Sequence, residues 1–410
     1  MNAKRLMGLV KLLTRTKQPS EKSTTFISSS ETCHSHHRLI TVSYSHYCEK
    51  ARFALSLSSL HGKFEEEQHL PAFHVPFTFD LRKTQRYPQT SEKYHIYDYL
   101  RQCDTKKSET KEKLSPKELT GVPKMCFNIS FNGTDKNNDV ITCDNSRGFE
   151  GAIANTKGTD NAMQVPVVIA NGSDGIMKYL YHHDSACEHF YPANIKEKVE
   201  NLEEFLNAEL GIAATDWAFS NMLLTSPNSP GRNEKSLDYF VNELTKLDNK
   251  KSSLLEIMLF KVFGKSTFLP LMIASNGVSE ERGKLARKKV TEVFDKIDAM
   301  LCDRDSASLN AYDDSNRAIT KFTYLFGTTK PTAADITLAT LAAPILLLDA
   351  TKENFPTMEN MESYIKDQSK SDNDVLKYQG MVEMLEFAAQ MKSTKAGSFM
   401  YKFFEIDLSL

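Results

Sequence analysis

Residues 45–52 read S-H-Y-C-E-K-A-R, and this stretch decides how the amino-terminal half of the chain folds. It directly follows a β-rich run, R-L-I-T-V-S-Y at 38–44, and it opens an apolar-faced helix that the pattern extends to about residue 60. Unpaired backbone N–H groups and the positive end of the helix dipole converge where a helix begins. A hydroxyl at that point, here Ser45, can therefore help to hold an anion, including a thiolate.

The composition is typical of a water-soluble protein. The 410 residues, 40% hydrophobic and 25% charged, are enough for two packed domains. The formal net charge of −2 lacks the basic excess of nucleic-acid-binding proteins, so we expect no nucleic-acid partner. The longest apolar stretch, 336–348, is too short to cross a bilayer, so it predicts a core helix and no integral membrane segment.

Seven cysteines are scattered along the chain without C-x-x-C spacing. Such a set is typical of reduced thiols rather than of a disulfide framework or a zinc site. We therefore expect no metal and a protein that is not secreted. The basic segment 1–37, rich in serine and threonine, fits a disordered tail or a transit peptide, which predicts a cytoplasmic or an organellar location respectively.

The pattern from 38 to 185 predicts a small α/β domain. It begins with a strand at 38–44, a helix at 46–60 and a strand at 64–68. Polar, charge-mixed sequence near 84–120 is typical of a solvated insertion. Strands at 122–130 and 165–169 are predicted to pair as a hairpin, with 132–164 as an enlarged loop. A helix then starts near 171, with Ser173 as N-cap candidate and Asp174 in the first turn.

The pattern from 192 to 405 predicts an all-α domain. Apolar residues three and four positions apart mark one helix face each at 195–210, 237–247, 254–262 and 290–301. The sequence T-A-A-D at 332–335 predicts a capping box ahead of the buried helix that ends near 348.

This order of elements resembles the cytosolic glutathione S-transferases, in which a thioredoxin-like domain precedes a helical bundle. Four stretches carry the resemblance: S-H-Y-C-E-K-A-R-F-A-L at 45–55, H-L-P-A-F-H-V at 69–75, S-D-x-I with Y-L at 173–180, and Y-L-F-G with P-T-A-A-D at 324–335. The chain departs from the family in its greater length and its two polar insertions. His46 replaces a common proline, and Gly172 replaces a frequent acidic residue.

The resemblance implies a site for glutathione as co-substrate. Ser45 would donate a hydrogen bond to the glutathione thiolate. Ser173 and Asp174 would bind the γ-glutamyl carboxylate and amine. Val122 would pair its backbone with the cysteinyl unit, and Pro123 would be the cis-proline after it. A small apolar electrophile between the two domains and a homodimer are also implied.

The proposed chemistry requires a thiolate. A free cysteine thiol titrates near 8.5, so only a few per cent is ionised at neutral pH. Lowering that pKa by about two units requires about 2.7 kcal/mol of preferential thiolate stabilisation. One hydroxyl hydrogen bond and the helix-terminal N–H groups are sufficient sources.

Two Val-Pro steps compete for the cis-proline position. Between Pro166 and Ser173 there is too little chain for a strand, a turn and another strand, whereas Pro123 leaves room for the hairpin. We therefore interpret Pro166 as a proline in an edge strand.

Other interpretations of these residues stay open. Ser45 fits an ordinary N-cap, and Ser173 with Asp174 fits simple capping. Cys48 fits a small core residue or the second position of a redox S-x-x-C pair. Lys50 and Arg52 are interpreted as solvated charges. The alternative functions are a non-catalytic glutathione-fold binding or scaffold protein and a Cys48-dependent thiol-disulfide enzyme.

Overall fold

The computed structural model describes residues 37–42, 44–70, 124–131, 163–224, 234–246, 254–310, 322–349, 357–368 and 377–407. Contacts divide the chain after Ser35, and all of these residues belong to the unit His36–Leu410. The predicted insertion at 84–120, the tail at 1–36 and nearly all of the loop at 132–164 lie outside the described residues.

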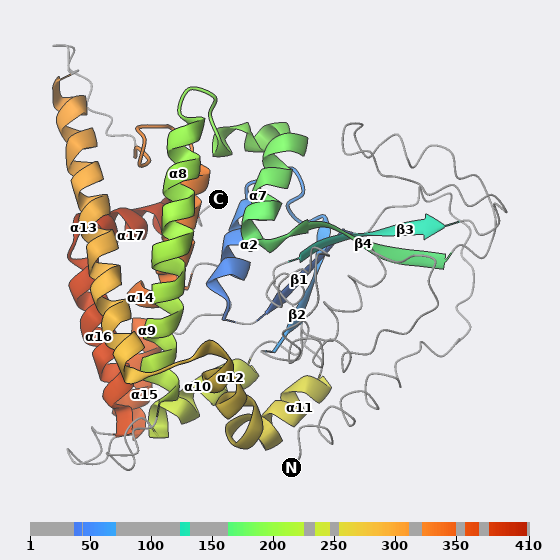
Figure 1. Ribbon diagram of the computed structural model, residues 1–410, viewed down its shortest axis with the longest axis vertical. Helices are drawn as coiled ribbons and strands as arrows, with labels where there is room; N and C mark the ends of the chain where they lie inside the picture. Colours follow the sequence, from blue (N-terminus) through green and yellow to red (C-terminus); the bar gives the residue numbers. More distant parts are fainter. Residues whose placement is uncertain are drawn as a thin grey trace, which may run out of the picture. The chain divides into compact units, whose positions relative to one another are not determined.

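The amino-terminal part contains a four-stranded mixed sheet in the order β2-β1-β3-β4 (Figure 1). Strand β1 (His37–Val42) pairs in parallel with β2 (Phe64–His69), and helix α2 (His46–Ser56) joins them. Strand β3 (Lys124–Phe131) runs antiparallel to both β1 and β4 (Met163–Asn171). The predicted strand–helix–strand unit and hairpin are thus confirmed, although α2 ends four residues earlier than the pattern predicted.

The interpretation of Pro166 is confirmed. It lies in β4, opposite Asn128 of β3, and β4 is at the edge of the sheet. A proline has no N–H to donate to a neighbouring strand, and an edge strand tolerates this because one of its sides has no partner strand.

The rest of the described chain is helical, as predicted. Helix α7 (Gly172–His183) follows β4, and a 3₁₀ turn, η1 (Ser185–Phe190), leads to the helical part. Helix α8 (Lys196–Leu206) continues through a single π turn, η2 (Asn207–Gly211), into α9 (Ile212–Leu223). The remaining elements are α10 (Glu234–Lys246), α11 (Leu254–Phe263), η3 (Gly264–Phe268), α12 (Leu269–Asn276), α13 (Glu280–Asn310), α14 (Ala333–Leu346), α15 (Met358–Gln368), α16 (Gln379–Lys392) and α17 (Lys395–Asp407).

Helix α14 is the predicted core helix. Every one of its residues except Pro344 is buried, and the helix packs against α2, α8, α9, α16 and α17. The predicted capping box is confirmed: the Thr332 N–H donates to one oxygen of Asp335 at 2.8 Å, and the Leu325 N–H donates to the other at 2.8 Å. Because α14 also contacts α2, its position fixes the helical part against the amino-terminal part.

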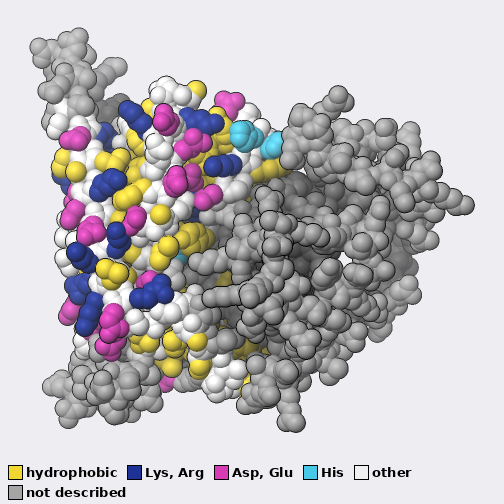
Figure 2. All heavy atoms as spheres, in the orientation of Figure 1, with side chains coloured by type: hydrophobic (Ala, Val, Ile, Leu, Met, Phe, Trp, Pro, Cys, Tyr) yellow, Lys and Arg dark blue, Asp and Glu magenta, His cyan; other side chains and the backbone are white. Residues whose placement is uncertain are grey.

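Basic and acidic side chains are interspersed over the helical face shown in Figure 2. Two ion pairs join α13 to neighbouring elements: Lys289 lies 2.6 Å from Glu209, and Arg282 lies 2.7 Å from Asp216. No single helix in the described ranges is long and apolar enough to cross a membrane. The segments 256–263 and 266–274 reach that length and composition only when taken together, across a bend of 73°.

Candidate functional site

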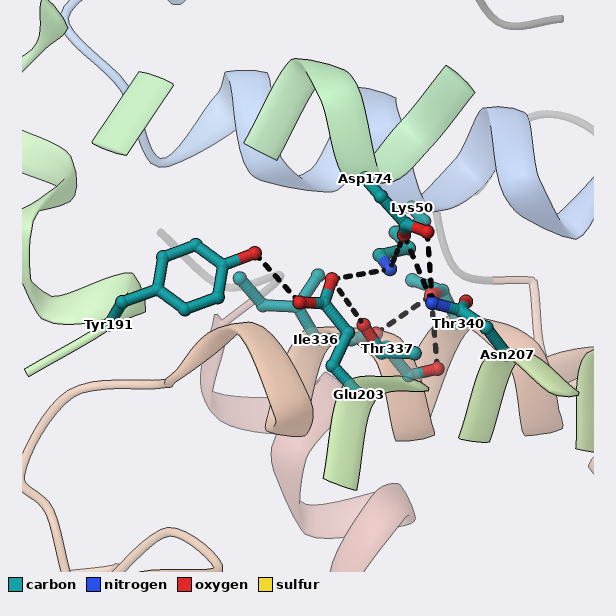
Figure 3. A network of polar contacts seen from close by, with 8 residues as sticks. All are labelled: Lys50, Asp174, Tyr191, Glu203, Asn207, Ile336, Thr337 and Thr340. Atoms are coloured by element: carbon teal, nitrogen blue, oxygen red, sulfur yellow. Dashed lines mark hydrogen bonds and ion pairs between the residues drawn. The ribbon is translucent and has the colours of Figure 1, made fainter. Parts of the chain in front are cut away.

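A buried lysine joins α2 to α7 and α8. The Lys50 Nζ lies 2.5 Å from an oxygen of Asp174 in α7 and 2.8 Å from an oxygen of Glu203 in α8 (Figure 3). The Lys50 side chain is completely buried, whereas that of Asp174 is 49% exposed. The charged contact therefore runs from the core to a carboxylate that solvent, or a ligand, can reach.

Further polar groups extend this network across the helical part. The Tyr191 hydroxyl donates to the second oxygen of Glu203 at 2.7 Å. Burial and, to a smaller extent, the charge of this carboxylate raise the pKa of Tyr191. The Asn207 amide donates to both oxygens of Asp174 at 3.1 Å. The Thr337 hydroxyl lies 3.5 Å from Glu203 (Figure 3). The network thus ties together α2, α7, α8, η2 and α14.

The interpretation of Lys50 and Arg52 as solvated charges is wrong. Arg52 is only 7% exposed; its Nε donates to Glu66 of β2 at 2.7 Å, and its guanidinium also contacts Glu49 and Thr41. All residues of α2 from 48 to 55 are buried, because the helix lies between the sheet and the helical part. The two charges can be buried there because each has carboxylate partners: α7 and α8 supply them to Lys50, whereas β2 and α2 itself supply them to Arg52.

Ser45 caps α2. Its Oγ accepts a hydrogen bond from the Cys48 N–H at 3.4 Å, and its side chain also hydrogen-bonds the Cys48 thiol. Capping uses a lone pair of the hydroxyl oxygen, and the O–H donates to the Cys48 sulfur, so it would have to leave that sulfur to donate to another acceptor. The structure thus places Ser45 at the predicted amino end, in the role of an N-cap.

Cys48 has the surroundings of a core residue. It is completely buried, and the Val42 N–H donates to its sulfur at 3.4 Å. Burial raises the pKa of the Cys48 thiol to about 11. A thiol that is rarely ionised and has no access to solvent is a poor redox nucleophile.

Ser173 and Asp174 lie in the first turn of α7. The helix begins at Gly172, one residue before the predicted cap, and Gly172 has a φ of 76° that a residue with a side chain rarely adopts. Ser173 is buried, and Asp174 lies in the first turn as predicted. Val122 and Pro123, the two remaining predicted site residues, lie outside the described residues.

The amino ends of α2 and α7 are close to one another. Lys50 is five residues after Ser45, about 7.5 Å along the helix axis, and Lys50 contacts Asp174 directly. In addition, burial and, to a smaller extent, the charge of Asp174 raise the pKa of Tyr47, in the first turn of α2, to about 12. Asp174 therefore lies beside the first two turns of the helix that Ser45 caps.

Sequence reasoning missed the contribution of the π turn η2. Asn207, its first residue, donates to Asp174; the backbone of Gly211, its last residue, hydrogen-bonds the His46 ring. A Cβ on Gly211 would lie 2.3 Å from the Tyr47 hydroxyl oxygen, so glycine allows this close approach. The apolar spacing is continuous across 195–210 and gives no sign of a π turn; the glycine at 211 is the one available signal.

Comparison with known proteins does not add to this description: no protein-family model matches the chain, and no curated protein is significantly similar to it. Within the ranges that the structure describes, no group of three or more histidine, cysteine or carboxylate side chains could hold a metal ion. Function is therefore inferred from the geometry at the amino ends of α2 and α7.

Replacing Lys50 with methionine should strongly destabilise the fold. Two carboxylates, one of them the buried Glu203, would lose their shared cation, which typically costs about 3–5 kcal/mol. Urea unfolding of Lys50→Met measures this loss. The control is Lys63→Met, an exposed site where a change below about 0.5 kcal/mol is expected. Equal stability of the two variants would contradict the account of this network.

Stability should fall between pH 6.5 and pH 4 because of His46. Burial lowers the pKa of His46 from 6.5 to about 4, so the unfolded chain binds a proton in this range that the folded chain resists. Stability is therefore complete above pH 6.5 and decreases by about 3 kcal/mol as the pH falls to 4. Comparing the pH dependence of unfolding in wild type and His46→Asn isolates this contribution, and identical profiles would exclude it.

Proposed function

We propose that this protein is a glutathione S-transferase-like protein that binds glutathione between the amino ends of α2 and α7. The sulfur would lie beside Ser45, and the γ-glutamyl end beside Ser173 and Asp174. The observation that carries the proposal is the contact between Lys50 and Asp174, which holds the first turn of α7 against the second turn of α2.

The order of elements supports a thioredoxin-like domain followed by a helical bundle. A parallel strand–helix–strand unit, an antiparallel hairpin and a helix that opens with Ser173 and Asp174 come first, and only helices follow. This is the order that the sequence resemblance implies. Homodimerisation and an intracellular location stay predictions.

The amino end of α2 suits a thiolate. The positive end of the helix dipole lies there, and the Ser45 hydroxyl, which caps the Cys48 N–H, would add a donor once it turned away from the Cys48 thiol. Lowering the pKa of a bound thiol by two units requires about 2.7 kcal/mol. A small apolar electrophile would then be attacked by the sulfur, with the electrophile held against the helical part.

The amino end of α7 suits the zwitterionic γ-glutamyl group. The helix N–H groups and Ser173 are donors for its carboxylate. Asp174 already has Lys50 and Asn207 as partners, but a carboxylate accepts about four hydrogen bonds and half of this side chain is exposed. The ligand ammonium would bind on that exposed side.

A non-catalytic glutathione-binding module is the second candidate. It is favoured by one observation, which is that the Ser45 hydroxyl is already engaged with the N–H and thiol of Cys48. In this case glutathione would bind without ionisation of its thiol. The thiol-disulfide alternative has less support, because Cys48 is completely buried and its pKa is raised to about 11.

Calorimetry with glutathione, combined with ultraviolet titration of the bound thiol, tests the proposal. Wild type should bind glutathione and show a thiolate signal near neutral pH. Ser45→Ala should keep binding but shift the pKa of the bound thiol toward 8.5. Ser56→Ala, at the opposite end of α2, is the matched control and should match wild type.

Each other outcome selects a different function. Binding without a thiolate signal would favour the non-catalytic module, and absence of binding would overturn the proposal. Loss of activity in Cys48→Ala but not in Ser45→Ala would indicate redox chemistry.

Removing the charge of Asp174 should weaken glutathione binding selectively. In Asp174→Asn the ligand ammonium loses a charged hydrogen bond, so the Kd should rise about 10- to 100-fold. A glutathione analogue without the α-amino group should bind wild type and variant about equally. Asp303→Asn, at an exposed site on α13, is the control. An equal loss of affinity for both ligands would argue against this role for Asp174.

A further inference from the structure

Helices α11 and α12 form an apolar pair that bends at the π turn η3 (Figure 1). Their segments 256–263 and 266–274 together reach the length and composition of a membrane span, with an angle of 73° between them. Between 254 and 276 the sequence has only three charged residues, which are Glu256, Lys261 and Lys265. The side chains that this pair exposes are therefore informative about what it contacts.

One face of the pair is packed against the rest of the protein. Helix α11 contacts α10, and α12 contacts α9. Ile257 and Phe260 of α11 are buried, and the Phe260 ring stacks on Phe268 of η3 with 5.9 Å between the ring centroids. This face is part of the core, and it fixes the orientation of α11.

Glu256 ties the first turn of α11 to the end of β2. Its carboxylate is buried; one oxygen lies 3.0 Å from Nδ1 of His69, and the other accepts a hydrogen bond from the Leu70 N–H at 3.2 Å. The ten residues of α11 extend over about 15 Å, half of the apolar thickness of a bilayer. A spanning arrangement would remove Glu256 from these partners and place its charge in lipid. The pair is suited to lie along a membrane surface rather than to cross it.

The opposite face of α11 is apolar and exposed. Met258 is 57% exposed and Val262 is 64% exposed, and their spacing of four residues makes them neighbours on the helix surface. Lys261 is exposed on the same face, and none of the described carboxylates forms an ion pair with it. A lysine in such a position can lay its apolar stem along the hydrophobic surface and keep its ammonium in water.

The charge on this face favours one kind of partner. The only acid between 254 and 276, Glu256, faces inward, so the outer face has a positive charge that no acid of the helix neutralises. Two copies of the same face would each bring Lys261 and no acid, and they would repel one another. Anionic lipid headgroups attract lysine side chains, and the acyl boundary beneath them accepts apolar ones.

We propose that the exposed face of α11 docks on the surface of an anionic lipid bilayer, with Met258 and Val262 inserted at the acyl boundary and Lys261 at the lipid phosphates. This is peripheral binding, and it leaves the buried contacts of Glu256 intact. It goes beyond the proposed glutathione site and does not depend on it.

Flotation with lipid vesicles tests the proposal. Wild type should bind vesicles of phosphatidylcholine with about one third phosphatidylserine, and about fivefold more weakly to phosphatidylcholine alone. Val262→Glu loses apolar insertion and adds a repelled charge, so binding should fall about 10-fold or more. Leu285→Glu is the matched control, because Leu285 is equally exposed, at 65%, but lies on α13. It should bind as wild type does.

Lys261→Gln separates the charge from the apolar contact. This variant keeps Met258 and Val262, so it should still bind vesicles, but its preference for phosphatidylserine should fall to about one. An unchanged preference would overturn the role of Lys261 and with it the choice of an anionic surface.

Tryptophan fluorescence gives an independent readout. The single native tryptophan, Trp217, is buried. In Val262→Trp the added emission should shift to shorter wavelength when vesicles containing phosphatidylserine are present, as it does when an indole leaves water. Leu285→Trp should show no such shift.

Three results would overturn the inference. The first is absence of vesicle binding by wild type. The second is an equal loss of binding in Val262→Glu and Leu285→Glu. The third is a wild-type dimer in sedimentation that Val262→Glu dissociates, which would assign this face to a second copy of the chain. None of these results bears on glutathione binding, so the proposed function is judged separately.

Discussion

The Lys50 ammonium, between Asp174 and Glu203, is the interaction on which the arrangement of the site depends. A fully buried cation is tolerated only with well-placed carboxylates, so helices α2, α7 and α8 must approach at fixed positions. One lysine and two carboxylates leave a formal charge of −1. The exposed side of Asp174 carries part of that charge to the surface, where it can attract a cationic group.

The same region combines requirements that conflict locally. Ser45 is needed as the cap of α2 and is also the hydroxyl expected to face a ligand sulfur. His46 is neutral and buried with an unpaired nitrogen at the end of a helix that favours anions. Folds tolerate such local conflicts mostly at functional sites. The coincidence of a capped helix, an unpaired imidazole and a π turn is therefore the best guide to where a ligand binds.

Sequence patterns predicted the elements well because those patterns are local. Short β-rich runs identified β1 and the hairpin strands, three- and four-residue spacing identified helices of the carboxyl-terminal half, and T-A-A-D identified the capping box before α14. The charges of α2 were misjudged because the partners of Lys50 lie 124 and 153 positions away in the chain. The π turn was missed since the apolar spacing continues through it.

In the proposed complex, one tripeptide bridges the amino ends of α2 and α7. Nuclear magnetic resonance of the backbone amides during a glutathione titration can detect both ends of that ligand at once. The amides of Cys48 and Ser173 should shift together and give the same Kd, as two ends of one ligand require. A shift at only one of these amides, or at neither, would contradict the proposed complex.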